Sequence, residues 1–107
     1  MFKSLQELAA ALKVIAPTKY SHFRDDPKTD YITYIDIGEN GFFTDNILTA
    51  RNTAVSIELH TKEKNLALEE QVRDILKQNE TPYDKNETLY DEDLDLFITE
   101  FIIELND

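Results

Sequence analysis

Both glycines of this 107-residue chain fall in one short stretch, Gly38-Glu39-Asn40-Gly41, between two strand-forming runs. Glycine adopts positive φ angles at little cost, and a tight turn between two strands is where a chain needs them. The run before the stretch, residues 31–37, is rich in β-branched and aromatic residues, and the run after it continues to Thr61. This pattern predicts a β-hairpin and constrains the fold more than any other feature.

The second strand of the predicted hairpin is unusually long for so small a chain. Residues 47–61 contain neither proline nor glycine. At about 3.3 Å per residue, an unbroken strand of this length would span roughly 50 Å, whereas a compact domain of this size is only about 35 Å across. Either the strand bends or its distal part, around residues 49–53, projects as an arm. A projecting ribbon with unpaired edges needs a partner.

Two amphipathic helices are predicted on either side of the hairpin. The first begins with a capping-box pattern at Ser4 and Glu7 and ends before Pro17. The second runs from an N-cap at Asn65 to about Asn79. Within this helix Glu69 and Arg73 are predicted to form an ion pair at i,i+4 spacing.

The remaining strands complete the predicted architecture. Short extended pieces are expected at residues 20–23 and around Tyr83, and residues 94–105 form a last strand that is apolar on both faces. Residues 31–37 also lack a polar face and are predicted to be central and covered on both sides. In the strand after the hairpin, alternate polar residues are expected on a solvated face: Ser56, Glu58 and His60. The order α, β, β, α, β predicts one α+β domain, residues 1–107, with a mostly antiparallel sheet, a long β-hairpin and two helices packed on one face.

The net charge of −11 is concentrated near the C-terminus. Residues 1–79 carry 12 acidic and 10 basic side chains, whereas residues 80–107 carry 10 acidic side chains and one basic one, Lys85. Affinity for a phosphate backbone comes from Lys and Arg, so no sequence-specific nucleic-acid binding is expected. The acidic segment suits a solvated edge, a face for a basic partner, or a channel surface that repels DNA.

No cofactor, metal or membrane is indicated by the sequence. The absence of cysteine excludes disulfides, thiolate catalysis and zinc–sulfur sites. The chain starts with an amphipathic helix rather than a signal peptide, and no apolar run approaches membrane length, so a soluble intracellular product is expected.

Candidate catalytic and calcium motifs also fail. The acidic run at residues 91–95 has Leu96 and Ile102 where a calcium loop requires glycine and glutamate. Ser56 and His60 would be about 13 Å apart on one strand, and both histidines are interpreted as hydrogen-bonded or solvated side chains. We therefore expect a protein that is not an enzyme.

Several short segments, taken in order and spacing, resemble one protein family. They comprise an aromatic strand, an aromatic-Asp-Asn turn, a strand that leads through Thr-Lys into a helix, and an aromatic final strand: residues 31–34, 42–46, 56–62, 65–72 and 97–103. Together they resemble the small tail-completion proteins of long-tailed bacteriophages and prophages, also called tail terminator or tail-to-head joining proteins. The likeness covers nearly the whole chain from Leu5. One departure is His60, where an aromatic residue such as tyrosine is expected.

The resemblance implies an α+β fold with a long hairpin, assembled as a homo-oligomeric ring that is commonly a hexamer. Such a ring caps the tail tube and joins it to the head connector, so the implied partners are sibling copies, the tail tube protein and the head connector protein. The implied location is the phage virion, after synthesis in the bacterial cytoplasm. Six copies at −11 each would carry −66, so ring closure is expected to depend on salt, divalent cations or the tail-tube template.

Ring or docking contacts are predicted on the hairpin, at Phe42, Phe43, Asp45, Asn46 and Arg51. Two adjacent phenylalanines in a strand point to opposite faces, so one of them leaves the core side. The alternative is that both are ordinary core and edge residues. A different functional class stays open as well: a small acidic inhibitor or DNA mimic that occupies a basic groove on a host enzyme.

Overall fold

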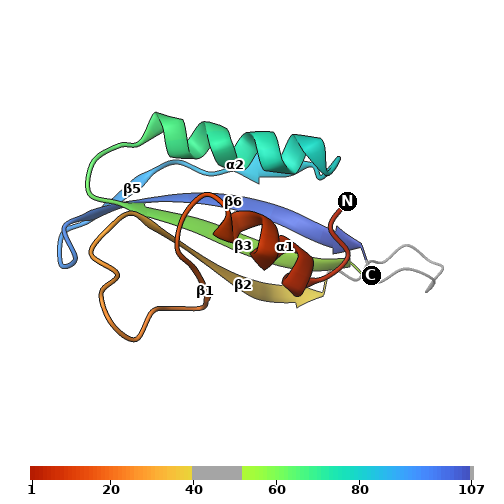
Figure 1. Ribbon diagram of the computed structural model, residues 1–107, viewed down its shortest axis with the longest axis horizontal. Coiled ribbons are helices and arrows are strands. Elements are labelled where there is room, and N and C mark those ends of the chain that lie inside the picture. Colours follow the sequence, from red (N-terminus) through yellow and green to blue (C-terminus); the bar gives the residue numbers. More distant parts are fainter. Residues whose placement is uncertain (40–51, 107) are drawn as a thin grey trace.

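The computed structural model describes residues 1–39 and 52–106 (Figure 1). In chain order the elements are α1 (Leu5–Lys13), β1 (Thr18–Tyr20), β2 (Tyr31–Glu39), β3 (Asn52–Thr61), α2 (Leu66–Gln78), β4 (Tyr83–Lys85), β5 (Leu89–Asp91) and β6 (Leu96–Asn106). The strands make one sheet in the order β1-β2-β3-β6-β4, and β5 also pairs with β6. Within it β1 runs parallel to β2 and the other pairs are antiparallel, so the predicted α+β fold with a mostly antiparallel sheet is confirmed.

Both helices begin where the sequence places them, because a side chain caps the first free N–H groups of each. The Ser4 hydroxyl accepts a hydrogen bond from the backbone N–H of Glu7 at 3.1 Å. The side-chain oxygen of Asn65 accepts one from the backbone N–H of Leu68 at 3.0 Å. These local bonds explain why the two helix starts could be predicted.

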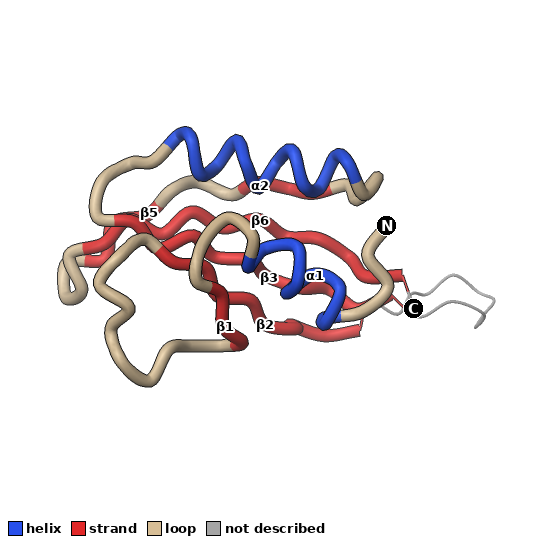
Figure 2. Tube along the Cα trace, in the orientation of Figure 1, coloured by secondary structure: helices blue, strands red, loops and turns tan. Residues whose placement is uncertain are grey.

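The hydrophobic core lies between the helices and one face of the sheet (Figure 2). β3 is the central strand and pairs with β2 on one side and β6 on the other, so alternate residues of the three strands share a face. Side chains from that face meet the helices in one cluster: Ile32, Val55, Ile57, Leu59, Phe101, Ile103 and Leu105 from the sheet, and Leu8, Leu12, Leu68, Val72 and Leu76 from α1 and α2. Both helices therefore pack on the same face, as predicted.

The opposite face of the sheet, called the open face below, has no helix over it in the described part of the chain. It carries the residues that alternate with the core: Tyr31, Thr33 and Ile35 of β2, Ala54, Ser56, Glu58 and His60 of β3, and Ile98, Glu100, Ile102 and Glu104 of β6. The prediction that residues 31–37 are covered on both sides is wrong, because both helices lie on the core face. Ile35 and Ile37 remain 38% and 55% exposed.

β2 and β3 pair as an antiparallel hairpin, but the tight turn predicted at Gly38-Glu39-Asn40-Gly41 is wrong, because Gly38 and Glu39 belong to β2 and pair with Ala54 and Thr53. β2 and β3 form an antiparallel ladder that continues to Glu39 and Thr53. Gly38 lies inside β2 rather than in the turn, next to a break in the register, and its φ of 137° is one that glycine adopts readily. Asn52 and Thr53, which the sequence assigns to a projecting arm, instead pair with β6. Residues 47–51 of the predicted long strand lie outside the described residues.

Candidate functional site

The side chains predicted to make ring or docking contacts lie outside the described residues: Phe42, Phe43, Asp45, Asn46 and Arg51. The structure does describe the end of the sheet to which they are joined along the chain, at Glu39 and Asn52. This part of the sheet, called the hairpin end below, is therefore where the prediction can be examined.

The outer edge of β2 is unpaired at the hairpin end, as far as the described residues show. β1 pairs with β2 only at residues 32–34, so β2 has no outer neighbour from Ile35 onward. On the other side of the sheet, β4 pairs with β6 as far as Ile103. Unpaired edges present free N–H and C=O groups that can pair with another chain. With Ile35 and Ile37 exposed beside one edge, this end of the sheet is suited to a further strand.

The open face carries carboxylates on the two neighbouring strands β3 and β6. Glu58 of β3 lies directly opposite Glu100 of β6, an arrangement that destabilises a sheet unless neighbouring groups compensate. Glu100 accepts hydrogen bonds from the Ser56 hydroxyl at 2.5 Å and from the Asn86 side-chain amide at 2.6 Å. Because hydrogen bonds to a charged carboxylate are strong, they offset part of the repulsion. The open face therefore combines negative charge with half-buried isoleucines.

His60 forms a buried polar centre on the same face. Its Nε2 lies 2.9 Å from the Thr33 hydroxyl and 3.4 Å from Oε1 of Glu58. Its ring stacks on Tyr31, with centroids 4.5 Å apart and planes at 8°. The residue is only 8% exposed, and its Nδ1 is buried without a hydrogen-bond partner among the described residues. His60 is therefore hydrogen-bonded rather than solvated, as one of the two predicted alternatives states, but only through Nε2.

The solvated face predicted for β3 is wrong for Ser56 and His60, whereas the Glu58 side chain is 39% exposed. Ser56 and His60 are 3% and 8% exposed although no helix covers them. Ser56 is small and lies in register between Ile35 and Ile102, whose larger side chains shield it. His60 is covered instead by Tyr31 and by the loop at residues 21–30, which contacts Tyr31. Period-two alternation predicts the face of a strand residue but not what a distant loop places over it.

Comparison with known proteins assigns no family. No protein-family model matches this chain, and no curated protein matches it either. Helices long and apolar enough to cross a membrane do not occur in the described part of the chain. Within residues 1–39 and 52–106, no three His, Asp or Glu side chains are grouped so that they could hold a metal ion. Function must therefore be inferred from the arrangement of the residues themselves.

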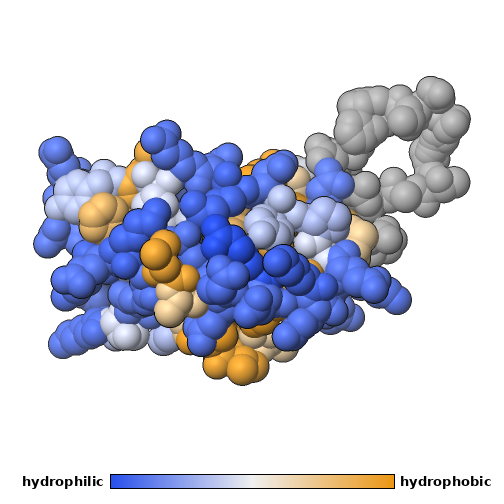
Figure 3. Space-filling model, turned by 90° about the horizontal axis from the view of Figure 1, so that it is seen from above, coloured by the Kyte–Doolittle hydropathy of each residue, from blue (hydrophilic) through white to orange (hydrophobic). Residues whose placement is uncertain are grey.

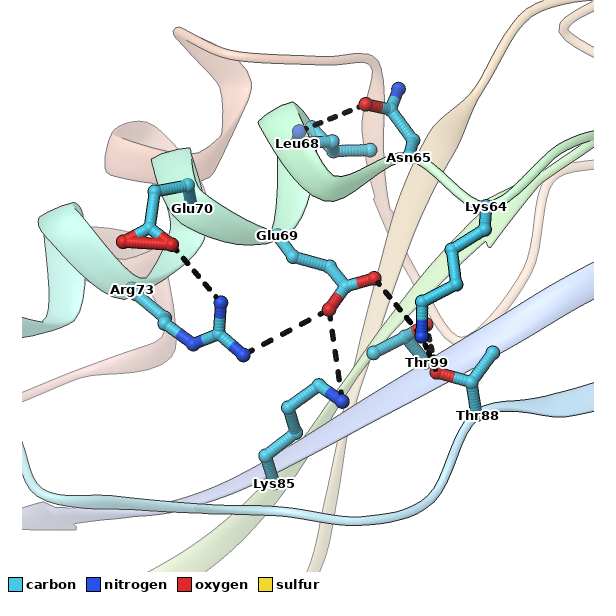
Figure 4. Close-up of polar contacts among 9 residues, drawn as sticks. All are labelled: Lys64, Asn65, Leu68, Glu69, Glu70, Arg73, Lys85, Thr88 and Thr99. Atoms are coloured by element: carbon cyan, nitrogen blue, oxygen red, sulfur yellow. Dashed lines mark hydrogen bonds and ion pairs between the residues drawn. The ribbon is translucent and has the colours of Figure 1, made fainter.

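A second polar cluster, centred on Glu69, lies between α2 and the sheet (Figure 4). The Glu69 carboxylate is only 3% exposed, yet three basic groups surround it: Lys64 and Arg73 at 3.9 Å, and Lys85 of β4 at 3.7 Å. Arg73 also pairs with Glu70 at 3.1 Å. The predicted i,i+4 pair is present, but it belongs to a buried cluster that joins α2 to β4. We interpret it as a structural clamp, because each group of the cluster is already partnered.

The contact between His60 and Glu58 leads to a testable pH effect. The pKa of Glu58 is lowered, first by its hydrogen bond to His60 and also by the charge of that side chain. Replacing His60 by glutamine is therefore expected to raise the pKa of Glu58 toward its ordinary value of 4.5, as measured by NMR titration of the carboxyl carbon. His22→Gln, which changes the exposed histidine, is the control and should leave the pKa of Glu58 unchanged.

The sign of the linked stability change follows from the lowered pKa. A carboxyl group whose pKa is lower in the folded state stabilises the fold above its unfolded pKa, and this contribution is lost as the pH falls through the folded value. The His60→Gln variant should thus lack the Glu58 contribution to stability above pH 4.5, and the difference in stability between the variant and the wild type should narrow in acid. An unchanged Glu58 titration in this variant would contradict the assigned cause.

Proposed function

We propose that this chain is a structural protein that assembles with copies of itself into a ring, as in the tail-completion proteins that its sequence resembles. The observation that carries the proposal is the hairpin end, where the outer edge of β2 is unpaired among the described residues. A strand edge gains backbone hydrogen bonds when another chain pairs with it. Burial of the exposed Ile35 and Ile37 at such a contact would add apolar stabilisation.

The helix side of the molecule offers less to a partner. Viewed over α2, the surface is largely hydrophilic and its hydrophobic residues lie in separate patches (Figure 3). Isolated apolar residues such as Leu66, at 65% exposure, are ordinary on a protein surface. The contact surface favoured by the structure is therefore the sheet at its hairpin end rather than the helix layer.

In this proposal the ring closes the tail tube and presents a surface to the head connector, so its partners are sibling copies, the tail tube protein and the head connector protein. Such rings are commonly hexamers in the family that the sequence resembles, and the proposed place of this one is the phage virion. A charge of −11 on each copy opposes closure. Ring closure should therefore occur only when salt, divalent cations or the tail tube reduce the repulsion between copies.

Sedimentation velocity in a series of NaCl and MgCl₂ concentrations tests the proposal. The wild-type chain is expected to sediment as a monomer at low salt and as a ring once its negative charge is screened. A tight hexamer that persists at nanomolar concentration whatever the salt would contradict the role given to charge. A chain that stays monomeric in every condition, the tail tube protein included, would contradict self-assembly, and one-to-one binding of a basic host protein would then favour the inhibitor reading.

A matched pair of variants locates the contact. Ile37→Asp adds a charge beside the β2 edge and is expected to leave a folded monomer that forms no ring. Leu66→Asp makes the same change at the first residue of α2, where an acidic side chain is well tolerated, and should assemble normally. Circular dichroism of both variants separates loss of assembly from loss of fold. If Ile37→Asp assembles as well as Leu66→Asp, the β2 edge is not the contact.

A further inference from the structure

The open face also contains a cavity of about 520 Å³, at the end of the sheet away from the hairpin end. It lies between the loop at residues 21–30, the neighbouring ends of β2 and β3, and the start of β6. Its lining includes Phe23, Asp26, Tyr31, His60 and Asp95. We propose that this cavity binds the arginine side chain of a basic partner protein.

The charge of the cavity favours a cation. Three carboxylates line it, those of Asp25, Asp26 and Asp95, against a single lysine, Lys62. None of the three forms an ion pair in the described part of the chain. Asp26 accepts a hydrogen bond from the Lys28 backbone N–H at 2.8 Å, and Asp95 accepts one from a tyrosine hydroxyl. Because Lys62 balances only one of these three exposed carboxylates, the lining of the cavity keeps an excess of negative charge.

Aromatic rings lie beside these carboxylates. Phe23 meets Tyr31 edge to face, with centroids 5.1 Å apart and planes at 72°, and Tyr31 stacks in turn on His60. Burial raises the pKa of Tyr31, and the negative charges of Asp26 and Glu58 raise it further. The same negative potential that disfavours a tyrosinate attracts a positive charge to the ring. Aromatic faces bind cations through their quadrupole, most effectively where water is partly excluded.

A buried polar atom of His60 that lacks a hydrogen-bond partner among the described residues is a second observation at this cavity. The His60 side chain is 90% buried and it lines the cavity, yet its Nδ1 has no hydrogen-bond partner in the part of the chain that the structure describes. Buried polar atoms of this kind are rare in a finished interior, and each one needs an explanation such as a missing ligand.

Arginine fits this combination better than other cations. The guanidinium group is planar, stacks on aromatic rings and carries five N–H donors, enough to reach several carboxylates together. The cavity volume is in the range of side-chain and small-ligand sites rather than that of a single ion. The proposal holds whether or not the chain forms rings, because the cavity lies at the opposite end of the sheet from the hairpin end.

The test is an NMR titration of the full chain with the peptide acetyl-Gly-Arg-Gly-amide. The ring resonances of Tyr31 and His60 should shift with a Kd on the order of millimolar, as expected for one side chain, and affinity should fall several-fold at about 0.5 M NaCl. The peptide in which citrulline replaces arginine keeps the shape without the charge and should not bind. Equal binding of the citrulline peptide, or no shift at roughly 20 mM peptide, overturns the proposal.

Two further arms separate the cavity from other acidic sites and other ligands. The double change Asp25→Asn and Asp26→Asn should weaken peptide binding about tenfold, whereas Asp84→Asn, on β4 away from the cavity, should leave it unchanged. Equal weakening by Asp84→Asn would show a diffuse attraction and overturn the assignment of binding to this cavity.

Spermidine, a free polyamine, should bind less tightly than the peptide, and tighter binding of spermidine would overturn the assignment to a protein side chain. Ring assembly plays no part in any of these readouts.

Discussion

Replacing Glu69 by glutamine is expected to lower the free energy of unfolding by about 2–3 kcal/mol. Removing one partner of a buried ion pair typically costs 3–5 kcal/mol, because the remaining charge is left uncompensated. Here the carboxylate is 3% exposed, but its partners Lys64, Arg73 and Lys85 are 49%, 26% and 25% exposed and can recover part of their hydration. The expected loss is therefore smaller than that for a fully buried pair.

Urea denaturation followed by circular dichroism measures this loss. Glu70→Gln is the matched control, because Glu70 lies on the same helix, pairs with the same Arg73 and is 59% exposed. An exposed pair of this kind contributes about 0.2–1 kcal/mol, so the two variants should differ clearly. If Glu69→Gln costs no more than Glu70→Gln, the cluster does not clamp α2 to the sheet.

The helices and the core alternation could be predicted from the sequence because their signals are local. Ser4 and Asn65 cap helices within three residues of their partners. Val55, Ile57 and Leu59 alternate along β3 and are buried, as the period-two pattern indicates. Such features depend on neighbours in the chain, which a single sequence displays directly.

The short strands β1 and β5 could not be placed in the same way. Each has three residues and exists because it pairs with a longer strand, β1 with β2 and β5 with β6. The sequence indicated an extended piece at residues 20–23, whereas β1 ends at Tyr20, and it gave no signal for β5. Pairing partners far along the chain decide such strands, and propensity alone does not identify them.

The polar clusters show the same limit. Spacing along α2 predicted the contact between Glu69 and Arg73, but Lys64 and Lys85 reach Glu69 from outside the helix, so no helical period relates them. The buried centre at His60 likewise depends on a loop some thirty residues earlier. The contacts predicted at residues 42–51 stay predictions, because those residues lie outside the described chain. The contacts that could not be predicted are therefore mainly those between residues that lie far apart in the sequence and close together in the fold.

The largest loss of stability is expected from Phe101→Ala, at about 3–5 kcal/mol. Phe101 is the largest fully buried side chain of the described core and is 0% exposed. Tyr83 meets its ring edge to face at 5.4 Å, and the Arg73 guanidinium lies 5.9 Å from the ring centroid. Truncation removes apolar burial, leaves a cavity and takes away the surface on which Arg73 rests. Because small domains have a total stability of roughly 5–15 kcal/mol, this variant is expected to be only marginally folded.

A graded change keeps the test informative if the alanine variant fails to fold. Phe101→Leu should cost about 1–2 kcal/mol, measured by urea denaturation. Phe97→Ala, on the same strand but only partly buried against Tyr90, is the control and should cost less than half as much as Phe101→Ala. Equal losses for Phe97→Ala and Phe101→Ala would contradict the central place given to Phe101.

Arg73 connects the core to the buried cluster around Glu69. The stability losses caused by changes at Phe101 and at Glu69 are therefore not expected to be additive. The guanidinium contacts both the Phe101 ring and the Glu69 carboxylate. Combining Phe101→Leu with Glu69→Gln is expected to cost less than the sum of the single losses, by about 0.5 kcal/mol or more, because each change already weakens the hold on Arg73. Phe97→Ala combined with Glu69→Gln should be additive. Additivity in both combinations would mean that the clamp and the core stabilise α2 independently.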